Sequence, residues 1–518
     1  MGATLGQARP INRDRLFLGT CFALVPTAAS FAIIGDILGP LKEEFILTNY
    51  QVGLIGGAAL WGMAISQILL GSLADLGMRA MLRTAFVCHL LGVATMISAT
   101  FSSGSTSAFW VLFVGAITLG LGNGFVEVAG NPLVAALFPD EKTTRLNQFH
   151  GWFPGGMVVS GLASYALAQT PFGDWEVRLG LTFIPILIYG ALTLREPFPE
   201  TEGVQAGVSF KEMFRATFTS RLFLVMFFCM MITASLELGP MRWIPSVLQS
   251  GGIPGILVLV WISGLMAVLR FKAGPLVERL SPTGLLLGSA IVSGVGLFLL
   301  SFAETVGIAF VVATVFAVGI AFFWPTMLGF VNERIPKSGA LGLGLMGGIG
   351  MTISGLVTIP VMGDIADRHV PDRLPVASTV ALLEEATRTF SDALGGVPEA
   401  RRQDVEKAIT LASQALDVYR EQGQLPGIET ANALRAILSS GVTSPVVARA
   451  QELLGPAENY GGRVSFRYVA PLAAIIIAIF GILYARDRRA GGYRPVRLVR
   501  VDSSARPARA AGDGGAHD

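Results

Sequence analysis

Among the ionisable side chains inside long apolar stretches of this 518-residue chain, four stand out: Asp36, Glu127, His150 and Glu237. On insertion scales, placing a charged side chain at the centre of a bilayer costs about 2.5–3.5 kcal/mol, so such groups are rare and usually functional. Carboxylates and imidazoles held away from water can take up and release protons. The pattern therefore predicts proton transfer that is linked to another process.

Glu127 lies in the glycine-rich stretch GLGNGFVEVAGNP, with amide side chains at helical spacing. Asn123, Glu127 and Asn131 follow one another at every fourth position, which places them on one face of a helix. Gly120 and Gly124 reduce the bulk of the same side. We expect this stripe to line a cavity in which Glu127 exchanges a proton. The alternative is a neutral carboxyl group that hydrogen-bonds between helices.

Two other ionisable residues leave two interpretations open. His150 could donate a hydrogen bond to a solute or titrate near pH 6.5, or it could bond a neighbouring helix. Glu237 could line the cavity or bond across helices, because Arg242, five residues further on, falls on another helix face. His89 has no polar partner at helical spacing, and we expect it to be structural.

The elements that must position these groups are apolar helices. The chain is 52% hydrophobic and 14% charged, whereas soluble domains carry nearer a quarter of charged residues. Apolar stretches of about 20 residues can each cross a bilayer as a helix, and barrel strands would be shorter and alternating. We predict an all-α polytopic membrane protein with about twelve spans, at residues 15–40, 50–74, 81–101, 107–138, 147–169, 178–195, 220–248, 253–272, 283–302, 306–331, 338–362 and 466–485.

Lysine and arginine residues gather in the loops on one side, together with both termini. The excess of positive charge on cytoplasmic loops predicts that both termini are cytoplasmic, in the cell (inner or plasma) membrane. The expected domains are an N-terminal six-helix bundle (1–195), a cytoplasmic linker (196–219), helices seven to eleven (220–363), an external helical insertion (364–464), helix twelve (465–490) and a disordered tail (491–518).

The external insertion carries an apolar stripe at helical spacing, formed by Val405, Ile409, Ala412, Leu416 and Tyr419. Such spacing predicts an amphipathic helix, and we expect a small helical cap on the outer mouth. Packing on the membrane part, binding of a partner and gating all remain open for it.

Several classes of function are excluded by what the chain does not carry. Its three cysteines are widely spaced within apolar runs and indicate neither a disulfide framework nor a metal site. No phosphate loop or nucleophile triad is evident, so we expect no enzyme and no cofactor. A net charge of +2 gives no signal for nucleic acid. The expected partners are a small solute, protons and lipid, and we expect a monomer.

The two halves of the chain resemble each other. GSLADLGMR at 71–79 and GPLVERLSP at 274–282 both give Gly, Leu two residues on, and an acid four residues on. Parallel six-plus-six repeats place a ligand site near the midplane, between the halves. The first copy looks like the loop signature of the major facilitator superfamily, although Leu76 and Met78 replace its usual base and second glycine. The resemblance implies gating contacts by Gly71, Asp75, Arg79, Gly274, Glu278 and Arg279.

A narrower resemblance covers the first half of the chain. GDILGPLKEEF and EVAGNPLVAALFPDEKTTRLN are similar to segments of the fucose–proton symporter family. The resemblance implies that Asp36 and Glu127 couple protons to solute. After the shared Arg-Leu-Asn, which ends at Asn147, His150 replaces a glutamine and Phe153 an asparagine, so fucose itself is not implied.

Together these features predict secondary transport of a small polar solute by proton symport, with a sugar as the first expectation. Trp324, like Trp243, could stack on a sugar ring or fill the core. Proton-coupled efflux of amphipathic compounds is the alternative, and a receptor with the insertion as sensor is a third hypothesis. The expected solute-binding residues are Asp36, Asn123, Glu127, Asn131, Asn147, His150, Glu237 and Trp324.

Overall fold

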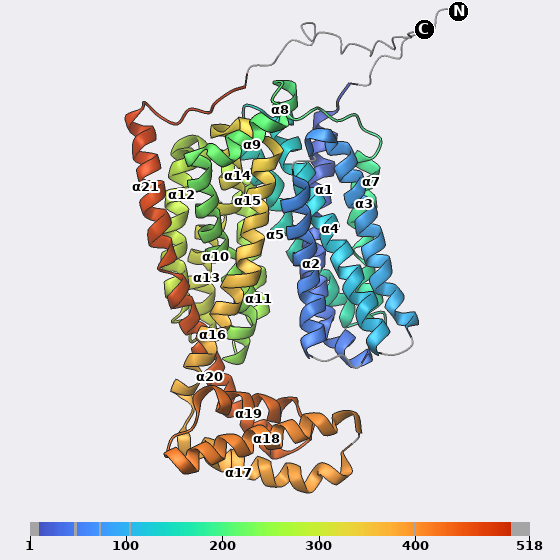
Figure 1. The fold of residues 1–518 in the computed structure, drawn as a ribbon, viewed down its shortest axis with the longest axis vertical. Coiled ribbons are helices and arrows are strands. Elements are labelled where there is room, and N and C mark those ends of the chain that lie inside the picture. The colour runs from blue at the N-terminus through green and yellow to red at the C-terminus, as the bar shows by residue number, and fades with distance from the viewer. Residues whose placement is uncertain (1–9, 46–48, 72–73, 103–104, 398, 499–518) are drawn as a thin grey trace, which may run out of the picture.

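The computed structural model describes residues 10–45, 49–71, 74–102, 105–397 and 399–498. Every regular element within these residues is a helix (Figure 1). The prediction of an all-α chain is therefore confirmed.

Among the described residues, nine helices are long and apolar enough to cross a membrane. They are Arg13–Leu38, Gly77–Phe101, Thr106–Leu137, Trp175–Thr193, Arg221–Ser250, Ala273–Leu300, Val306–Arg334, Pro336–Arg373 and Pro445–Arg489. Shorter apolar helices run over Leu54–Leu70 and Gly255–Phe271. Helix α5 (Lys142–Ala168) is as long as the others but less apolar, because polar residues fill its first turns. These three helices complete the expected count of about twelve.

The N-terminal bundle contains the first six spans. Its helices are α1 (Arg13–Glu44), α2 (Asn49–Leu70), α3 (Ala74–Ile97), α4 (Ser105–Leu137), α5, and the pair α6 (Trp175–Gly180) and α7 (Phe183–Thr193), which form one broken span.

Helix α4 packs tightly within this bundle because its glycines carry no side chain. A Cβ atom placed on Gly120 would lie 2.2 Å from the main-chain oxygen of Ala59 on α2. Small residues of this kind let membrane helices approach closely. The glycine-rich stretch around Glu127 thus positions α4 against its neighbours.

The C-terminal bundle follows a linker with two short helices, α8 (Glu202–Gln205) and α9 (Phe210–Thr219). Ser209 and Glu212 begin α9 with a capping box, in which each side chain bonds the other residue's main-chain N–H. The bundle comprises α10 (Arg221–Ser250), α11 (Gly255–Phe271), α12 (Ala273–Leu300), α13 (Val306–Ile320), α14 (Phe323–Arg334), α15 (Gly339–Ile353), α16 (Ile359–His369) and α21 (Leu472–Arg489).

The insertion consists of α17 (Val376–Ala393), α18 (Glu399–Gln422), α19 (Gly427–Ser439) and the first part of α20 (Pro445–Val469). It has its own apolar core, to which Phe390, Val405 and Leu416 contribute. The expected helical insertion between the last two spans is present. Figure 1 places it at the end of the molecule opposite the termini, and α20 continues from it toward α21. We call these two ends the terminal side and the insertion side.

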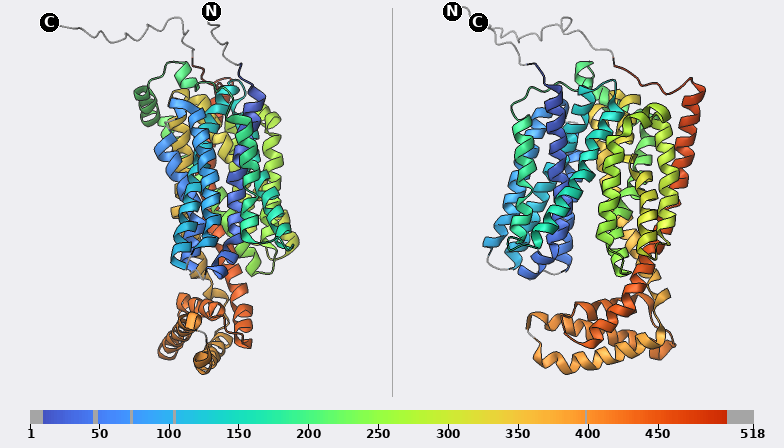
Figure 2. Two further views of the ribbon diagram at one scale, coloured as in Figure 1. Left: turned by 90° about the vertical axis from the view of Figure 1, so that its right-hand side faces the viewer. Right: turned by 180° about the vertical axis from the view of Figure 1, so that it is seen from behind.

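The two bundles meet on the terminal side. A Cβ atom on Gly71, at the end of α2, would lie 3.0 Å from the Cα atom of Gly344 on α15. Helix α5 packs against α11 and α14 of the other bundle. In Figures 1 and 2 the two sets of helices lie closest near the terminal side and diverge toward the insertion side.

Candidate functional site

Glu127 lies in a buried polar cluster formed by α4 and α5. The Asn131 side-chain amide donates to Glu127 Oε2 over 2.7 Å, and His150 Nε2 donates to Asn131 Oδ1 over 2.9 Å. His150 Nε2 is also 3.8 Å from Glu127 Oε2. The three side chains are 7%, 4% and 3% exposed. Three residues that the sequence singled out are therefore brought together, away from bulk water.

Arg270 joins this cluster from the other bundle. Its guanidinium donates to the main-chain oxygen of His150 over 3.2 Å and to Glu237 Oε1 over 2.9 Å. It also donates to the main-chain oxygen of Ala321 over 2.5 Å. Arg270 is only 3% exposed and Glu237 only 4%. A fully buried ion pair in the C-terminal bundle is thereby linked by a hydrogen bond to the N-terminal bundle.

Sequence reasoning missed Arg270 because it stands beside Lys272, at the end of its apolar stretch, where a cation is typical of a loop. The available signal was its position inside the expected span 253–272. A cation inside a membrane span needs an acidic partner, and Glu237 lies inside a neighbouring expected span.

Asn123 does not share the environment of Glu127. It is fully buried inside the N-terminal bundle, where its Oδ1 lies 3.1 Å from His89 Nε2 and its amide donates to Ser30 Oγ over 3.1 Å. His89 Nδ1 lies 3.0 Å from the hydroxyl of Tyr189. These groups form a closed hydrogen-bonded chain across four helices of one bundle, so Asn123 presents no free polar atom to a solute here.

Asp36 lies apart from Glu127, toward the insertion side. Its carboxylate accepts from Ser164 Oγ over 2.6 Å and from Arg178 over 3.0 Å. Along the antiparallel helices α1 and α4, which are tied by the bond between Ser30 and Asn123, a rise of 1.5 Å per residue separates the two acids by roughly 15 Å. Arg178 itself is only 6% exposed.

Two further residues that we expected to bind solute are Asn147, which lies at the interface between the bundles, and Trp324, which lies inside the C-terminal bundle. The Asn147 amide donates to Thr326 Oγ1 over 3.2 Å, across the two bundles. Trp324 is 6% exposed, and a Cβ atom on Gly350 would come within 2.6 Å of its ring. In this conformation Trp324 fills the core and no solute can stack on it.

Several buried polar atoms near the interface have no hydrogen-bond partner among the described residues. They include both polar atoms of the Gln67 side chain, Asn147 Oδ1, Glu237 Oε2 and Ser263 Oγ. Their helices come from both bundles: α2 and α5 from the first, α10 and α11 from the second. An unpaired buried polar atom costs about 1–3 kcal/mol and needs an explanation, such as an ordered water or a ligand.

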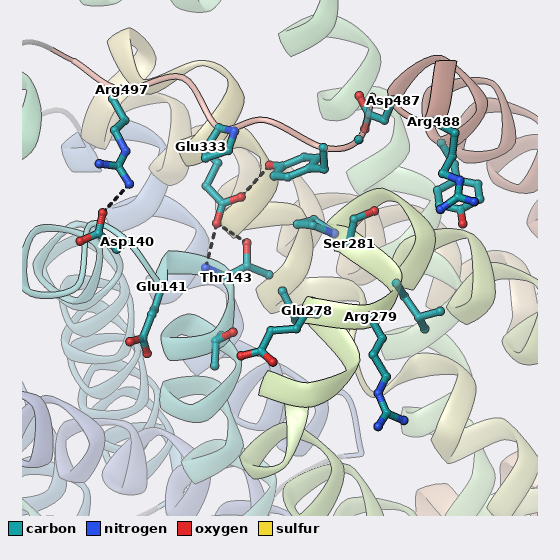
Figure 3. Close-up of a pocket in the computed structure, with 18 of the residues that line it drawn as sticks. Asp140, Glu141, Thr143, Glu278, Arg279, Ser281, Glu333, Asp487, Arg488 and Arg497 are labelled. Atoms are coloured by element: carbon teal, nitrogen blue, oxygen red, sulfur yellow. Dashed lines mark hydrogen bonds and ion pairs between the residues drawn. The ribbon is translucent and has the colours of Figure 1, made fainter. Parts of the chain in front are cut away.

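The residues expected to form gating contacts lie on the terminal side. Gly71 contacts α15 as described above, and Arg79 donates to the main-chain oxygen of Leu194 within its own bundle over 3.1 Å. The side chain of Asp75 lies outside the described residues. Gly274 approaches Thr144 of the other bundle, and Glu278 and Arg279 line a pocket between the bundles (Figure 3).

Residues 493–497, which we call the C-terminal strap, cross this pocket. Tyr493 donates to Glu333 Oε2 over 2.6 Å, and Arg497 forms a 2.7 Å ion pair with Asp140 of the N-terminal bundle. Glu333 also accepts from the main-chain N–H and hydroxyl of Thr143 (Figure 3). Residues 491–498 of the expected disordered tail are described, and Tyr493 and Arg497 make these specific contacts within them. The rest of the expected tail, 499–518, lies outside the described residues.

A second cavity lies between the bundles toward the insertion side, and we call it the insertion-side cavity. Helix α1 lines it with Phe31, Ile34 and Gly35, helix α2 with Leu60, and helix α10 with Arg242. Arg242 is exposed. It has neither a hydrogen-bond partner nor an ion-pair partner in the described part of the chain.

The architecture and the buried cluster define a class of protein. Two six-helix bundles of the same orientation, with buried ionisable groups where they meet, are typical of secondary transporters. A sequence model of the Major Facilitator Superfamily matches residues 20–359. The chain belongs to this superfamily and is a multi-pass membrane protein, so it is a transporter and not an enzyme.

Curated relatives within the superfamily are distant. A niacin/nicotinamide transporter of Bacillus subtilis is 24% identical over 389 residues, which cover 71% of this chain and 92% of that protein. A cis,cis-muconate transport protein of Acinetobacter baylyi is 26% identical over 248 residues, which cover 45% of this chain and 58% of that protein.

The fold resemblance extends to solved structures. The crystal structure of the fucose:proton symporter of E. coli aligns with a TM-score of 0.54 at 20% sequence identity, covering 68% of this chain and 92% of that one. The expected resemblance to the fucose–proton symporter is confirmed at the level of fold.

Proposed function

We propose that this protein takes up a small polar solute by proton symport, with alternating access between two sides of the membrane. The observation that carries the proposal is the Glu127 cluster. A carboxyl group is buried among neutral partners, Asn131 and His150, and His150 is bonded to Arg270 of the other bundle. Proton binding at Glu127 can thereby alter the contact between the bundles.

Charge balance supports Glu127 as the proton carrier. The buried cluster contains two carboxyl groups, Glu127 and Glu237, and one guanidinium, Arg270. Arg270 is directly paired with Glu237. An uncompensated buried charge is expensive, so the cluster is neutral when Glu127 is protonated. Loss of that proton would draw Arg270 toward Glu127 and weaken its existing bonds, which is the kind of differential interaction that alternating access requires.

We further propose that the terminal side is cytoplasmic, in the cell (inner or plasma) membrane. Three arginines, Arg486, Arg488 and Arg489, end α21 on that side, as the positive-inside rule expects. The contacts between α2 and α15, between α5 and α11, and across the C-terminal strap then close the cytoplasmic side. Glu127 would receive its proton from outside, and solute and proton would leave inward after the bundles rock.

Support for a polar solute comes from the unpaired buried atoms of Gln67, Asn147 and Glu237 at the interface. The sequence favours a sugar, and the matched solved structure is that of a fucose:proton symporter. Two curated relatives are named for other small polar solutes, niacin or nicotinamide and cis,cis-muconate. We place Asp36, paired with Arg178, at the outer entrance and not in direct contact with the proton carrier.

Proteoliposomes with an imposed pH gradient test the coupling. The wild type should accumulate a solute identified by a thermal-shift panel of sugars and organic acids. Glu127→Gln should lose accumulation but still exchange labelled solute, because the amide mimics the protonated acid. Glu212→Gln, at the exposed start of α9, is the matched control. Unchanged gradient-driven accumulation by Glu127→Gln would refute the role of Glu127.

A further inference from the structure

Resting on the proposed function, we infer that the transported solute is an organic anion whose carboxylate is bound by Arg242 in the insertion-side cavity. Arg242 lies on α10 and lines this cavity together with α1 and α2 of the other bundle. The cavity thus lies where a solute that enters between the bundles would be held. Arg242 is the one charged side chain among the residues that line it.

Arg242 differs from three other arginines of the membrane part in its lack of an ion-pair partner among the described residues. Arg178 pairs with Asp36, Arg270 with Glu237, and Arg463 with Glu304, at 2.9–3.1 Å. Arg242 has no carboxylate or hydrogen-bond acceptor within reach among the described residues. A guanidinium is built to bind a carboxylate through two parallel hydrogen bonds. Because Arg242 is exposed and pairs with no acid among the described residues, its guanidinium is free to bind the carboxylate of a solute in the cavity.

The other walls of the cavity fit the remainder of such a molecule. Phe31, Ile34 and Leu60 are apolar, and the Phe31 ring packs edge-on against Phe153 with 5.3 Å between centroids. The hydroxyl of Ser30 already donates to the main-chain oxygen of Thr27 and accepts from Asn123. One cation and apolar walls suit a carboxylate with a hydrophobic body. A sugar would find few groups here for its hydroxyls, and an amphipathic cation would be repelled.

Gly35 leaves room for a solute in the insertion-side cavity. A Cβ atom added there would meet no other atom within 4 Å, although Gly35 lines the cavity. A Cβ atom at this position therefore clashes with nothing, and a valine would extend from it into the solute's volume. A Cβ atom added to Gly288 on α12 would likewise meet nothing within 4 Å. Because Gly288 does not line the cavity, it serves as a matched control.

Binding to the purified full chain tests the inference. The probes are benzoate, phenylacetate and pyruvate, each beside its uncharged amide, together with L-fucose and D-xylose. We expect at least one acid to raise the unfolding temperature more than its amide does. Arg242→Gln should weaken that binding roughly ten-fold or more, because the carboxylate would lose the cation that pairs with it. Arg242→Lys should retain part of the binding, since lysine keeps the positive charge but cannot form the two parallel hydrogen bonds of a guanidinium.

Three controls separate binding from folding. Arg368→Gln, in an exposed ion pair on α16, should bind the acid like the wild type. Gly35→Val should lose binding while Gly288→Val keeps it, and this pair decides the question if Arg242→Gln fails to fold. The inference is overturned if no acid outperforms its amide, or if a sugar binds wild type and Arg242→Gln equally well. Failure of the proposed function has a different signature, which is gradient-driven uptake that Glu127→Gln does not change.

Discussion

Arg270 donates a hydrogen bond to the main-chain oxygen of His150, and so the only fully buried ion pair of the C-terminal bundle's described residues is tied to the N-terminal bundle beside Glu127. His150 in turn bonds Asn131, which bonds Glu127. Glu127, the proposed proton site, and the interface between the bundles are therefore parts of one network. A substitution at Glu127 should therefore alter the contact between the bundles, and a substitution at Arg270 should alter proton binding at Glu127.

Replacing Arg270 by Gln should strongly destabilise the protein. Glu237 would remain as a buried charge without its partner, at a cost of about 3–5 kcal/mol when one member of a buried pair is removed. Thermal unfolding of the purified variant measures the loss. The double variant Arg270→Gln with Glu237→Gln should regain much of the stability, because no buried charge is left. A double variant no more stable than the single one would contradict this account of the pair.

Replacing Asn123 by Ala should reduce stability and leave solute affinity unchanged. The substitution removes the partners of His89 Nε2 and Ser30 Oγ, and leaving such buried groups unpaired costs about 1–3 kcal/mol. Unfolding temperature and solute affinity are measured on the same preparation. A clear loss of affinity at unchanged stability would restore the original expectation that Asn123 binds solute.

The fold was predictable because membrane spans are encoded by length and apolarity, which are local properties of the sequence. The pair of Glu127 and Asn131 was predictable from its spacing, whereas Asn123 was not part of it. Four residues turn a helix by about 400°, so each step drifts by about 40°. Over eight residues Asn123 and Asn131 therefore no longer point to the same side of α4. Asn123 faces α3 and α1, whereas Asn131 faces α5.

The partners of the arginines could not be predicted, because they depend on contacts between distant helices. Arg178 begins the predicted span 178–195, and Arg242 lies near the end of the predicted span 220–248. Arg178 meets Asp36 across 142 positions of sequence, and Arg242 faces a cavity. The C-terminal strap could not be predicted either, because the composition of this segment is typical of disorder. Its contacts depend on distant residues, since Tyr493 bonds Glu333 and Arg497 pairs with Asp140.

Removing the C-terminal strap should favour opening of the terminal side. Truncation after Gly492 removes the bond from Tyr493 to Glu333 and the ion pair between Arg497 and Asp140. Of these two contacts, only the ion pair crosses between the bundles. An exposed ion pair is worth about 0.2–1 kcal/mol, so opening should become up to roughly five-fold more frequent. The reporter is alkylation of a cysteine placed at Ala340, which is 3% exposed and packs against the N-terminal bundle.

Two comparisons make the strap experiment decisive. The native residues Cys21, Cys88 and Cys229 are first replaced by Ser or Ala so that only the reporter reacts. Truncation after Arg497 keeps the strap and removes only the residues beyond it, so its alkylation rate should equal that of the full chain. Equal rates for both truncations would show that the strap does not hold the terminal side closed.

His150 should act as a neutral hydrogen-bond donor and not as a second proton carrier. Asn131 donates its amide to Glu127 and presents only its oxygen to His150 Nε2, which must then carry a hydrogen. Because Arg270 lies against the main chain of His150, a second positive charge on the imidazole would be repelled. His150→Gln keeps a donor and should preserve both accumulation and its pH dependence. His150→Leu leaves Asn131 Oδ1 unpaired and should impair both. Uptake measured from pH 5.5 to 8 separates the two roles, and a shifted pH profile in a stable His150→Gln protein would make His150 a titrating participant.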